Sequence, residues 1–372
     1  MKYRCSCHGQ RCEQKSELDT SIATVYSVYT EMTDITAAGC KAEKPKSLSL
    51  RPPVRVVIPG GAGHLGRIVA GHLQTNGNAV AVLSRGGTVA PWRVVSWNGA
   101  DIADWTRELE DADVVINLAG RSVNCRYNAR NRREILESRI RSTELLGEAI
   151  SKLRQPPRLW INASTATIYR HSLDREMDEA TGELGGREVD VPDTWRFSIE
   201  VATRWERTFF AANTPRTRKI ALRSAMVMSA ERAGTFDLLL RLVRFGLGGK
   251  SGSGKQFVSW IHEDDFVRAM DYLIEHGEFE GTVNVASPNP LPNEEFMRLL
   301  RKAWGARVGL PASRWMLEVG ALFLRTETEL ILKSRRVVPG LLVTSGFEFR
   351  FPEWRCAAKD LVQRWRKQGW SA

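Results

Sequence analysis

The residues with the clearest chemical meaning form the segment Gly60-Gly-Ala-Gly63-His64-Leu65-Gly66. It follows a short apolar run and opens a stretch with helical periodicity. Glycines at these spacings allow a tight turn, close helix–sheet packing and the approach of a pyrophosphate. The start of a helix also offers free N–H groups to phosphates. The segment therefore predicts a dinucleotide site, and the alternative is an ordinary glycine turn.

Ser84 and Arg85 follow the second apolar run and bear on which dinucleotide would bind. An acidic residue about 20 positions after the glycines would bind a ribose 2′-hydroxyl and indicate NAD. Here that place holds Arg85, and a guanidinium suits a 2′-phosphate, with the serine hydroxyl as a second donor. We therefore expect NADP(H), although a solvated surface arginine is the alternative.

Two further groups follow along the chain. Leu118 and Ala119 end another apolar run, at the sheet edge where such folds bind ligands. Arg139 lies on the next expected helix and is predicted to reach a cofactor phosphate or ribose, unless it forms a surface ion pair.

The stretch 249–255 satisfies G-x₄-G-K, but Gln256 stands where a P-loop needs Ser or Thr to hold Mg²⁺. We interpret that stretch as a substrate or lid loop.

Strands and helices must alternate to position these groups. Strands are expected at 54–59, 79–83, 94–97, 113–118, 159–163, 220–228 and 257–261, and helices at 64–76, 130–153, 235–245 and 264–276. This order predicts an α/β fold of the Rossmann type, with a doubly wound parallel sheet. A smaller, mainly helical region should follow from about 290, with four tryptophans in its core: Trp304, Trp315, Trp354 and Trp365.

The composition of the 372 residues excludes several classes of protein. Hydrophobic residues make up 42% and charged residues 26%, which is typical of a globular protein. The net charge of +11 is spread along the chain, so we expect no nucleic-acid partner. No run approaches the ~18 apolar residues of a membrane helix, and no signal peptide opens the chain. A cytoplasmic protein without a membrane partner is expected.

The first 52 residues lack periodicity and predict a disordered leader before a cofactor domain at 53–280 and a C-terminal domain at 281–368. Cys5, Cys7, His8 and Cys12 stand close together in that leader. Their spacing does not match the paired cysteine units of zinc sites, so no metal is expected.

Several segments together resemble the extended short-chain dehydrogenase/reductases, and more narrowly their atypical epimerase-family subgroup with a C-terminal domain of unknown function. Besides the glycine motif, the matching segments are 117–120, 138–140, 164–169, 205–206, 246–249, 259–262, 284–290, 336–339 and 346–352. The resemblance implies a Rossmann core that binds NADP(H). By motif position it implies cofactor contacts from Ser84, Arg85, Leu118, Ala119, Glu134, Arg139 and Ser229.

The chain departs from this family at the catalytic residues. The broad family uses Ser or Thr with Tyr-x-x-x-Lys, where the tyrosine transfers the proton. Alignment on Glu206 puts the tyrosine and lysine positions at Ser198 and Ala202, which cannot do this work unaided. Thr165 keeps the Ser/Thr position, and Tyr169 is the nearest substitute for the tyrosine, with a packed aromatic as the alternative.

Three other side chains are candidates for catalysis or substrate binding. His262 is a possible base and His171 a weaker one, and a satisfied structural histidine is the alternative for His262. Arg223 is expected either to contact an anionic group or to form a structural salt bridge.

The function expected is therefore an NADP(H)-dependent oxidoreductase or epimerase-like enzyme for a small hydroxyl or carbonyl substrate. The C-terminal region would close over that substrate, and a homodimer is possible. Loss of the Tyr/Lys pair leaves an alternative, a non-catalytic protein that senses NADP(H) or regulates a partner.

Overall fold

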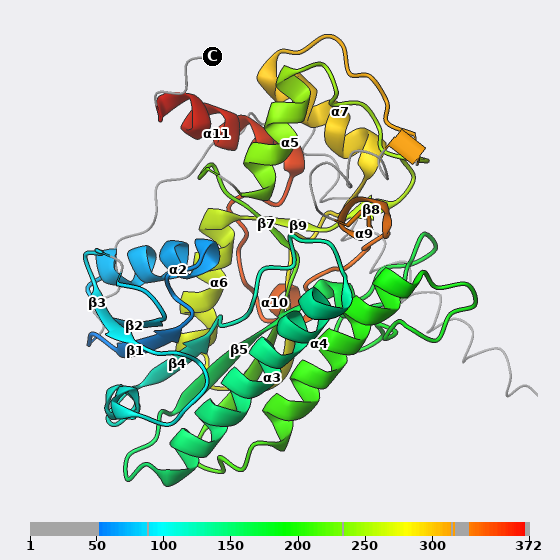
Figure 1. Ribbon diagram of the computed structural model, residues 1–372. Coiled ribbons are helices and arrows are strands. Elements are labelled where there is room, and N and C mark those ends of the chain that lie inside the picture. Colours follow the sequence, from blue (N-terminus) through cyan, green and yellow to red (C-terminus); the bar gives the residue numbers. More distant parts are fainter. Residues whose placement is uncertain (1–51, 88, 233, 314, 317–326, 369–372) are drawn as a thin grey trace, which may run out of the picture. The chain divides into compact units, whose positions relative to one another are not determined.

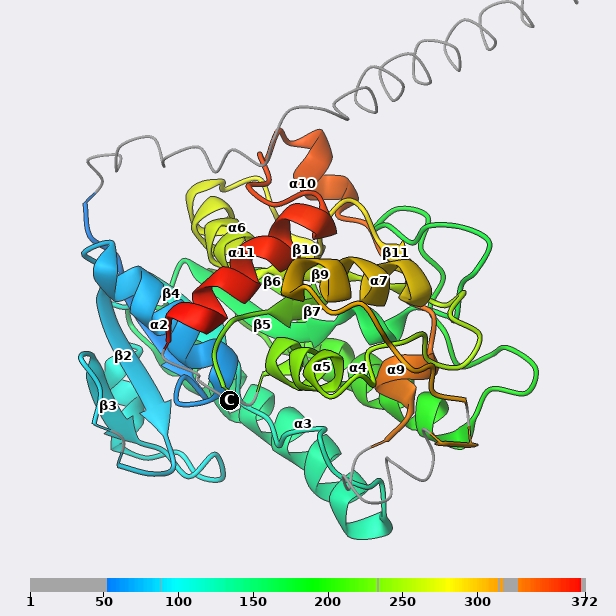
Figure 2. The same ribbon diagram turned by 90° about the horizontal axis from the view of Figure 1, so that it is seen from above.

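Seven parallel strands form one sheet in the order β10-β6-β5-β4-β1-β2-β3. The strands are β1 Arg55–Pro59, β2 Ala79–Ser84, β3 Arg93–Ser96, β4 Val114–Asn117, β5 Leu159–Thr165, β6 Arg218–Ser224 and β10 Gly281–Val285. β1 lies between β2 and β4, so the winding reverses there, and ligands bind such sheets at this point. The expected Rossmann-type α/β fold is confirmed in this computed structural model (Figures 1 and 2).

The structure describes residues 52–368 apart from 88, 233, 314 and 317–326. The expected leader and the cysteines at 5, 7 and 12 lie outside the described residues. Within the described part, no helix has both the length and the apolar character needed to cross a membrane.

Alternate residues of each strand face opposite layers of helices. Val56 and Ile58 of β1 pack in one core with α2 (His64–Thr75) and α6 (Glu263–Glu275). Val57 packs in the other core with α3 (Ala129–Lys152) and α4 (Asp193–Ala211), which run side by side in Figure 1. Burial on both faces explains why the inner strands β1, β2 and β4 are mostly apolar.

A third core lies beyond the carboxyl ends of the strands. It is built from β7 (Met226–Met228), β8 (Phe257–Val258), β9 (Trp260–His262), β11 (Leu291–Pro292), α5 (Thr235–Arg244), α7 (Asn293–Trp304) and α11 (Trp354–Lys367). Trp354 stacks on Phe296 with ring centroids 4.0 Å apart and meets Trp260 edge-on. Residues 226–262 therefore share a core with the C-terminal residues, although in the sequence they lie between β6 and β10, two strands of the main sheet.

Two strand predictions were wrong in the same way. The expected strand 220–228 is two strands, because β6 ends at Ser224 and β7 then pairs with β9 outside the main sheet. The expected strand 257–261 is also two, because β8 pairs with β11 while β9 pairs with β7. Consecutive residues thus join different sheets, which an unbroken apolar run cannot reveal.

The tryptophan prediction held in part. Trp354 and Trp365 are fully buried, and Trp304 is half-buried and packs against the same core. Trp315 is 68% exposed, so its expected core position was wrong. It lies in the connection between α7 and the short helix α9 (Glu329–Leu332), outside the helices that cover the core.

Two elements near the site were absent from the expected pattern. α4 carries Ser198 and Ala202, and β10 is an edge strand paired with β6. The sheet therefore extends past residue 280, where the boundary between the two domains was expected. Another short helix, α10 (Gly340–Thr344), covers β10.

Two glycines of α2 offer a matched test of this packing. A Cβ on Gly66 would lie 2.5 Å from the carbonyl oxygen of Gly61, whereas one on Gly71 would meet its nearest neighbour, Trp92, at 3.8 Å. Gly66→Ala should lower the free energy of unfolding by about 1–3 kcal/mol through overpacking. Gly71→Ala should raise it by about 0.5–1 kcal/mol, because glycine is a poor helix residue. Urea denaturation measures both, and equal effects would contradict the packing.

Candidate functional site

The glycine segment makes the turn between β1 and α2. Gly60 has φ +77°, and a Cβ there would lie 2.7 Å from the backbone of Ala119, just beyond β4. The Gly60 N–H donates to the carbonyl oxygen of Leu83 at the end of β2 (2.9 Å). Gly60 thus brings three strand ends together, and Leu118 and Ala119 lie beside the glycine turn as predicted.

The start of α2 is open. A Cβ on Gly63 would meet only the carbonyl oxygen of Gly60, at 3.3 Å, and no side chain caps the helix. The first N–H groups of an α-helix have no acceptor within the helix. His64 Nε2 is also buried without a hydrogen bond in the described part of the chain. Bare donors beside an open glycine fit a pyrophosphate.

Ser229 reaches this turn from the second half of the chain. Its buried hydroxyl accepts from the N–H of Glu231 (3.1 Å). Glu231 lies 3.4 Å from His64 Nδ1 and 3.7 Å from the Arg67 guanidinium, both in the first turn of α2. The loop after β7 therefore lies beside the start of α2, which brings Ser229 close to the predicted phosphate site.

Ser84 and Arg85 occupy the end of β2. Ser84 is half-buried, and Arg85 is exposed. Across the described residues, Arg85 makes no hydrogen bond or ion pair. Leu83, two residues before Arg85 in the chain, is hydrogen-bonded to Gly60 of the glycine turn. Arg85 therefore belongs to the segment that follows this contact.

Glu134 and Arg139 both lie on α3 but have different surroundings. Glu134 pairs with Arg130 (2.8 Å) and with Arg121. Arg139 is half-buried and donates to the carbonyl oxygens of Arg121 (3.0 Å) and Ile135 (2.9 Å). Burial lowers the pKa of Arg139 to about 10, and none of the described carboxylates pairs with it. Arg139 thus lies under the loop that follows β4, instead of forming a surface ion pair.

A buried amide network joins the end of β4 to the middle of β5, and sequence reasoning missed it. Asn117 Nδ2 donates to Asn162 Oδ1 (2.7 Å), and Asn117 Oδ1 accepts from the Ala119 N–H (3.1 Å). Thr143 of α3 links this pair to the Trp205 indole of α4 (3.0 Å). The available signal was one asparagine in each of two apolar strand segments, Val114–Asn117 and Leu159–Thr165. The network fixes the backbone that carries Ala119.

Tyr169 lies inside a second network. Its hydroxyl donates to Asn284 Oδ1 (2.9 Å) and accepts from Arg223 Nη1 (2.9 Å). Arg223 in turn forms two hydrogen bonds with Glu206, at 2.8 and 2.7 Å. Burial raises the pKa of Tyr169, and the Arg223 charge opposes that rise. These contacts match the packed-aromatic interpretation of Tyr169 and the salt-bridge interpretation of Arg223.

Thr165 ends β5 and is half-buried, with its hydroxyl accepting from the Thr167 N–H (3.1 Å). Ser164 beside it donates to Glu206 (2.6 Å). The two departures from the family pattern lie on α4. Ala202 is buried in a small apolar cluster, and Ser198 is half-buried.

Both candidate histidines are held by other groups. His262 is fully buried, its Nδ1 accepts from the Asp264 N–H (3.0 Å), and its Nε2 lies 3.1 Å from Asp360. These contacts match the structural interpretation of His262, which was the alternative to a catalytic base. His171 stacks on Trp195, and its Nδ1 accepts from the Ser334 N–H (3.1 Å). Burial lowers the pKa of His171, which makes it a weak base.

Sequence reasoning also missed the charged groups on and after α9. Glu329, Lys333 and Arg335 are at most 6% exposed and lie against α4 and the end of β5. Burial, with Arg335 nearby, lowers the pKa of Lys333 to about 7. Burial raises the pKa of Glu329, although Arg335, Ser198 and Lys333 all favour its charged form. Charged residues spaced through an otherwise mixed segment gave no sign of this burial.

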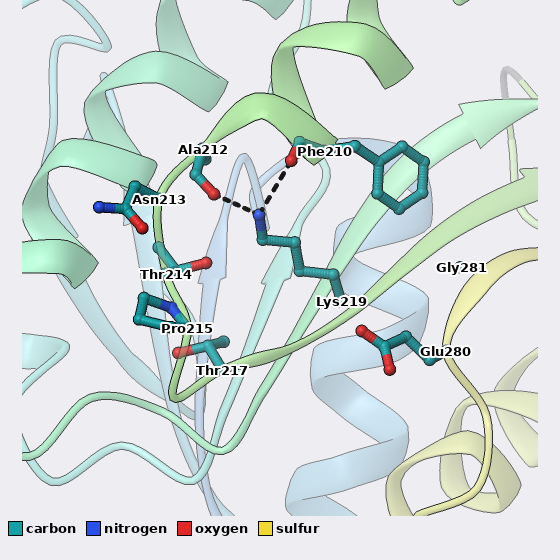
Figure 3. Close-up of a pocket in the computed structure, with 9 residues that line it drawn as sticks. All are labelled: Phe210, Ala212, Asn213, Thr214, Pro215, Thr217, Lys219, Glu280 and Gly281. Carbon is teal, nitrogen blue, oxygen red and sulfur yellow. Dashed lines mark hydrogen bonds between the residues drawn. The ribbon is translucent and has the colours of Figure 1, made fainter.

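One open hollow lies away from these groups (Figure 3). Its lining residues are Phe210, Ala212, Asn213, Thr214, Pro215, Thr217, Lys219, Glu280 and Gly281. Lys219 Nζ donates to the carbonyl oxygens of Phe210 (3.3 Å) and Ala212. The hollow is at the amino ends of β6 and β10, the opposite edge from the glycine turn. Among the described residues, no three His, Cys, Asp or Glu side chains gather as a metal site would require.

Comparison with known proteins gives two matching regions. Residues 56–189 match the NAD dependent epimerase/dehydratase family, and residues 312–361 match a domain of unknown function, DUF1731. The chain is 31% identical to the epimerase family protein SDR39U1 of Homo sapiens over 314 residues, which cover 83% of this chain and all of that protein. It is 28% identical to the epimerase family protein YfhF of Bacillus subtilis, over 83% of this chain and 98% of that protein.

Solved structures give the same picture. The crystal structure of human SDR39U1 (isoform 2) with NADPH matches with a TM-score of 0.72 and 29% identity, over 83% of this chain and 99% of that chain. A nucleoside-diphosphate sugar epimerase from Corynebacterium glutamicum matches with a TM-score of 0.64 and 27% identity, over 84% of this chain and 59% of that chain.

The contacts of Tyr169 lead to a test of its role. Tyr169→Phe removes the hydroxyl between Asn284 and Arg223, so the free energy of unfolding should fall by about 1–3 kcal/mol. The affinity for NADPH should not change, because the hydroxyl lies in the network around Arg223 and not at the glycine turn. Chemical denaturation and calorimetric titration measure the two effects. A loss of nucleotide affinity with unchanged stability would assign Tyr169 to the cofactor site.

Proposed function

The chain belongs to the NAD-dependent epimerase/dehydratase family, and from that premise we propose that it binds NADP(H) and exchanges hydride with a small molecule. The reacting carbon of that molecule would carry a hydroxyl or carbonyl group. The resemblance found in the sequence motifs is confirmed by the family matches, including the C-terminal domain of unknown function.

The observation that carries the proposal is the open start of α2 beside a free arginine. Gly63 and the uncapped helix leave room and donors for a pyrophosphate. Arg85, with no partner among the described residues, supplies a guanidinium for a 2′-phosphate. A relative that matches over nearly its whole length, human SDR39U1, was crystallised with NADPH, which supports the same cofactor here.

Each remaining candidate residue has a proposed task. The backbone of Leu118 and Ala119 would flank the adenine or ribose, and Ser84 would assist Arg85. Arg139 would stabilise the loop after β4, and Ser229 would approach the cofactor from the loop after β7. Glu134, paired with Arg121 and Arg130, would support that edge of the site.

When bound, the nicotinamide would accept or supply the hydride. Thr165 would donate a hydrogen bond to the substrate oxygen at the end of β5. Its hydroxyl proton is free for this purpose, because the contact with Thr167 uses the oxygen as an acceptor.

A second function is favoured by one observation. Ala202, at the position of the family lysine, is buried in an apolar cluster with Ile168, Tyr169 and Val337, so no charge can act from there. We therefore keep the proposal of a non-catalytic protein that senses NADP(H). Oxidation of NADPH by members of a panel of aldehydes and ketones distinguishes the two functions.

The cofactor preference rests on Arg85. NADPH should bind at least tenfold more tightly than NADH, a difference of about 1.4 kcal/mol, and Arg85→Ala should abolish the difference. Calorimetric titration of both nucleotides measures it. Arg204→Ala is the control, since Arg204 is an exposed arginine on α4. Equal affinities in the unmodified protein would refute the assignment of the 2′-phosphate to Arg85.

The phosphate site rests on Gly63. Gly63→Val should reduce NADPH affinity at least a hundredfold, because its side chain would occupy the space in front of the uncapped helix. Its melting temperature should stay within a few degrees of the original, since φ is −69° and a Cβ would meet only one neighbour within 4 Å, the Gly60 carbonyl oxygen at 3.3 Å. Fluorescence titration with NADPH gives the affinity. Binding that survives the valine would remove the glycine turn from the site.

A further inference from the structure

The family's acid/base tyrosine is absent, but its position is not chemically empty. Ser198 stands there on α4 and is half-buried. A serine hydroxyl alone is too weak an acid to replace a tyrosine, so any proton transfer at this position needs a second group. The following inference concerns that group and rests on the proposed function.

A carboxylate from the C-terminal region meets Ser198. The Ser198 hydroxyl donates to Glu329 Oε2 over 2.5 Å, and 131 residues separate the two in the chain. Glu329 is 1% exposed, and its Oε1 has no hydrogen bond in the described part of the chain. A short hydrogen bond from a hydroxyl to a buried carboxylate is the arrangement in which a base activates a hydroxyl group.

The same segment connects Glu329 to the end of β5. Arg335 lies 3.8 Å from Glu329 Oε1, and its Nε donates to the Thr167 hydroxyl (3.1 Å). Lys333 Nζ donates to the carbonyl oxygen of Thr167 (2.7 Å). The Thr167 N–H donates to Thr165, the residue at the family's Ser/Thr position. Ser198 and Thr165 are thus joined through one set of contacts.

The charges around Glu329 suit a group that gains and loses a proton. Burial raises its pKa, and Glu327 adds to that rise, whereas Arg335, Ser198 and Lys333 lower it. The result is a carboxyl whose pKa is above the ordinary value. A base with a raised pKa holds a transferred proton better near neutral pH.

Tyr127, on the loop before α3, is a second neighbour of the Ser198 hydroxyl. Burial raises the pKa of Tyr127 to about 12, although a hydrogen bond with Ser198 opposes that rise. A phenol with so high a pKa is a poorer acid than an ordinary tyrosine. Among the groups that contact Ser198, the carboxylate is therefore the better proton acceptor.

We propose that Ser198 and Glu329 together replace the missing tyrosine, with Ser198 as the catalytic residue that exchanges a proton with the substrate oxygen. Glu329 is the positioning residue, because it acts on the substrate only through the serine. Arg335 lies 3.8 Å from the carboxylate and so supplies the positive charge that the missing lysine would have given, while Lys333 binds the carbonyl oxygen of Thr167.

The proton and electron balance is complete with NADP⁺ as the oxidant. In alcohol oxidation, the carbon–hydrogen bond breaks and its electron pair leaves with the hydride to NADP⁺. The substrate O–H bond breaks as its proton passes to Ser198 Oγ, and the serine's own proton passes to Glu329. The product is a carbonyl compound, and Glu329 is left protonated. Reduction of a carbonyl reverses each step.

The test counts protons on nucleotide binding and needs no substrate. Calorimetry in buffers of different ionisation enthalpy gives the protons released when NADP⁺ or NADPH binds. The 2′-phosphate titrates in both nucleotides, so the difference between them reports the positive charge of the oxidised ring. A positive charge within about 4–6 Å lowers a carboxyl pKa by about 1–3 units. NADP⁺ should therefore release more protons than NADPH in the pH range where Glu329 titrates, and titrations over a series of pH values locate that range.

Four variants assign that difference to its source. Glu329→Gln should abolish it. Glu327→Gln should keep it and move it to lower pH, and Lys333→Met should keep it and move it to higher pH, because Glu327 raises the pKa of Glu329 and Lys333 lowers it. Ser198→Ala should move the difference to higher pH by about one unit, since the carboxylate loses a donor.

The outcomes separate this inference from the proposed function. Binding of neither nucleotide would overturn both. Binding of both nucleotides with equal proton release in the unmodified protein would overturn the Ser198–Glu329 pair alone. A difference that persists in Glu329→Gln, or disappears in Tyr127→Phe with Glu329 intact, would also overturn it.

Discussion

The buried ion pair between Arg223 and Glu206 holds together the elements around the site. Burial of either charge alone would be strongly unfavourable, and each is tolerable because the other is there. Burial alone would lower the pKa of Arg223, but the Glu206 carboxylate raises it. Glu206 binds Ser164 at the end of β5, and Arg223 binds Tyr169, which reaches Asn284 on β10. One pair of charges thus sets the relation of α4 to three strands.

Local features of the sequence predicted the glycine turn and the strand ends that form the proposed cofactor site. Gly60 and Gly66 allow contacts within one turn, and Arg85 follows a strand whose apolar residues identify it. The alternation of strands and helices likewise depends on neighbouring residues. Where two sheets share consecutive residues, as around Ala225 and Ser259, the apolar pattern stays continuous and the prediction failed.

The contacts around Ser198 and Thr167 could not be predicted in the same way, because they join distant residues. Lys333 and Thr167 are 166 positions apart, and Ser198 and Glu329 are 131 positions apart. No periodicity relates such residues. The departure at Ser198 and Ala202 was visible in the sequence, but the group that faces them was not. Family resemblance supplied the positions, and only the fold supplied their neighbours.

The third core, which residues 226–262 share with the C-terminal residues, has a consequence for synthesis of the protein on the ribosome. Trp260 of β9 packs against Trp354, which leaves the ribosome roughly 90 residues later. At about 5–20 residues per second, that interval lasts roughly 5–20 seconds. During it, the apolar side chains of β7, β9 and α5 have no partner from α11. These apolar side chains therefore stay uncovered for longer than the early glycine turn and first strands would suggest.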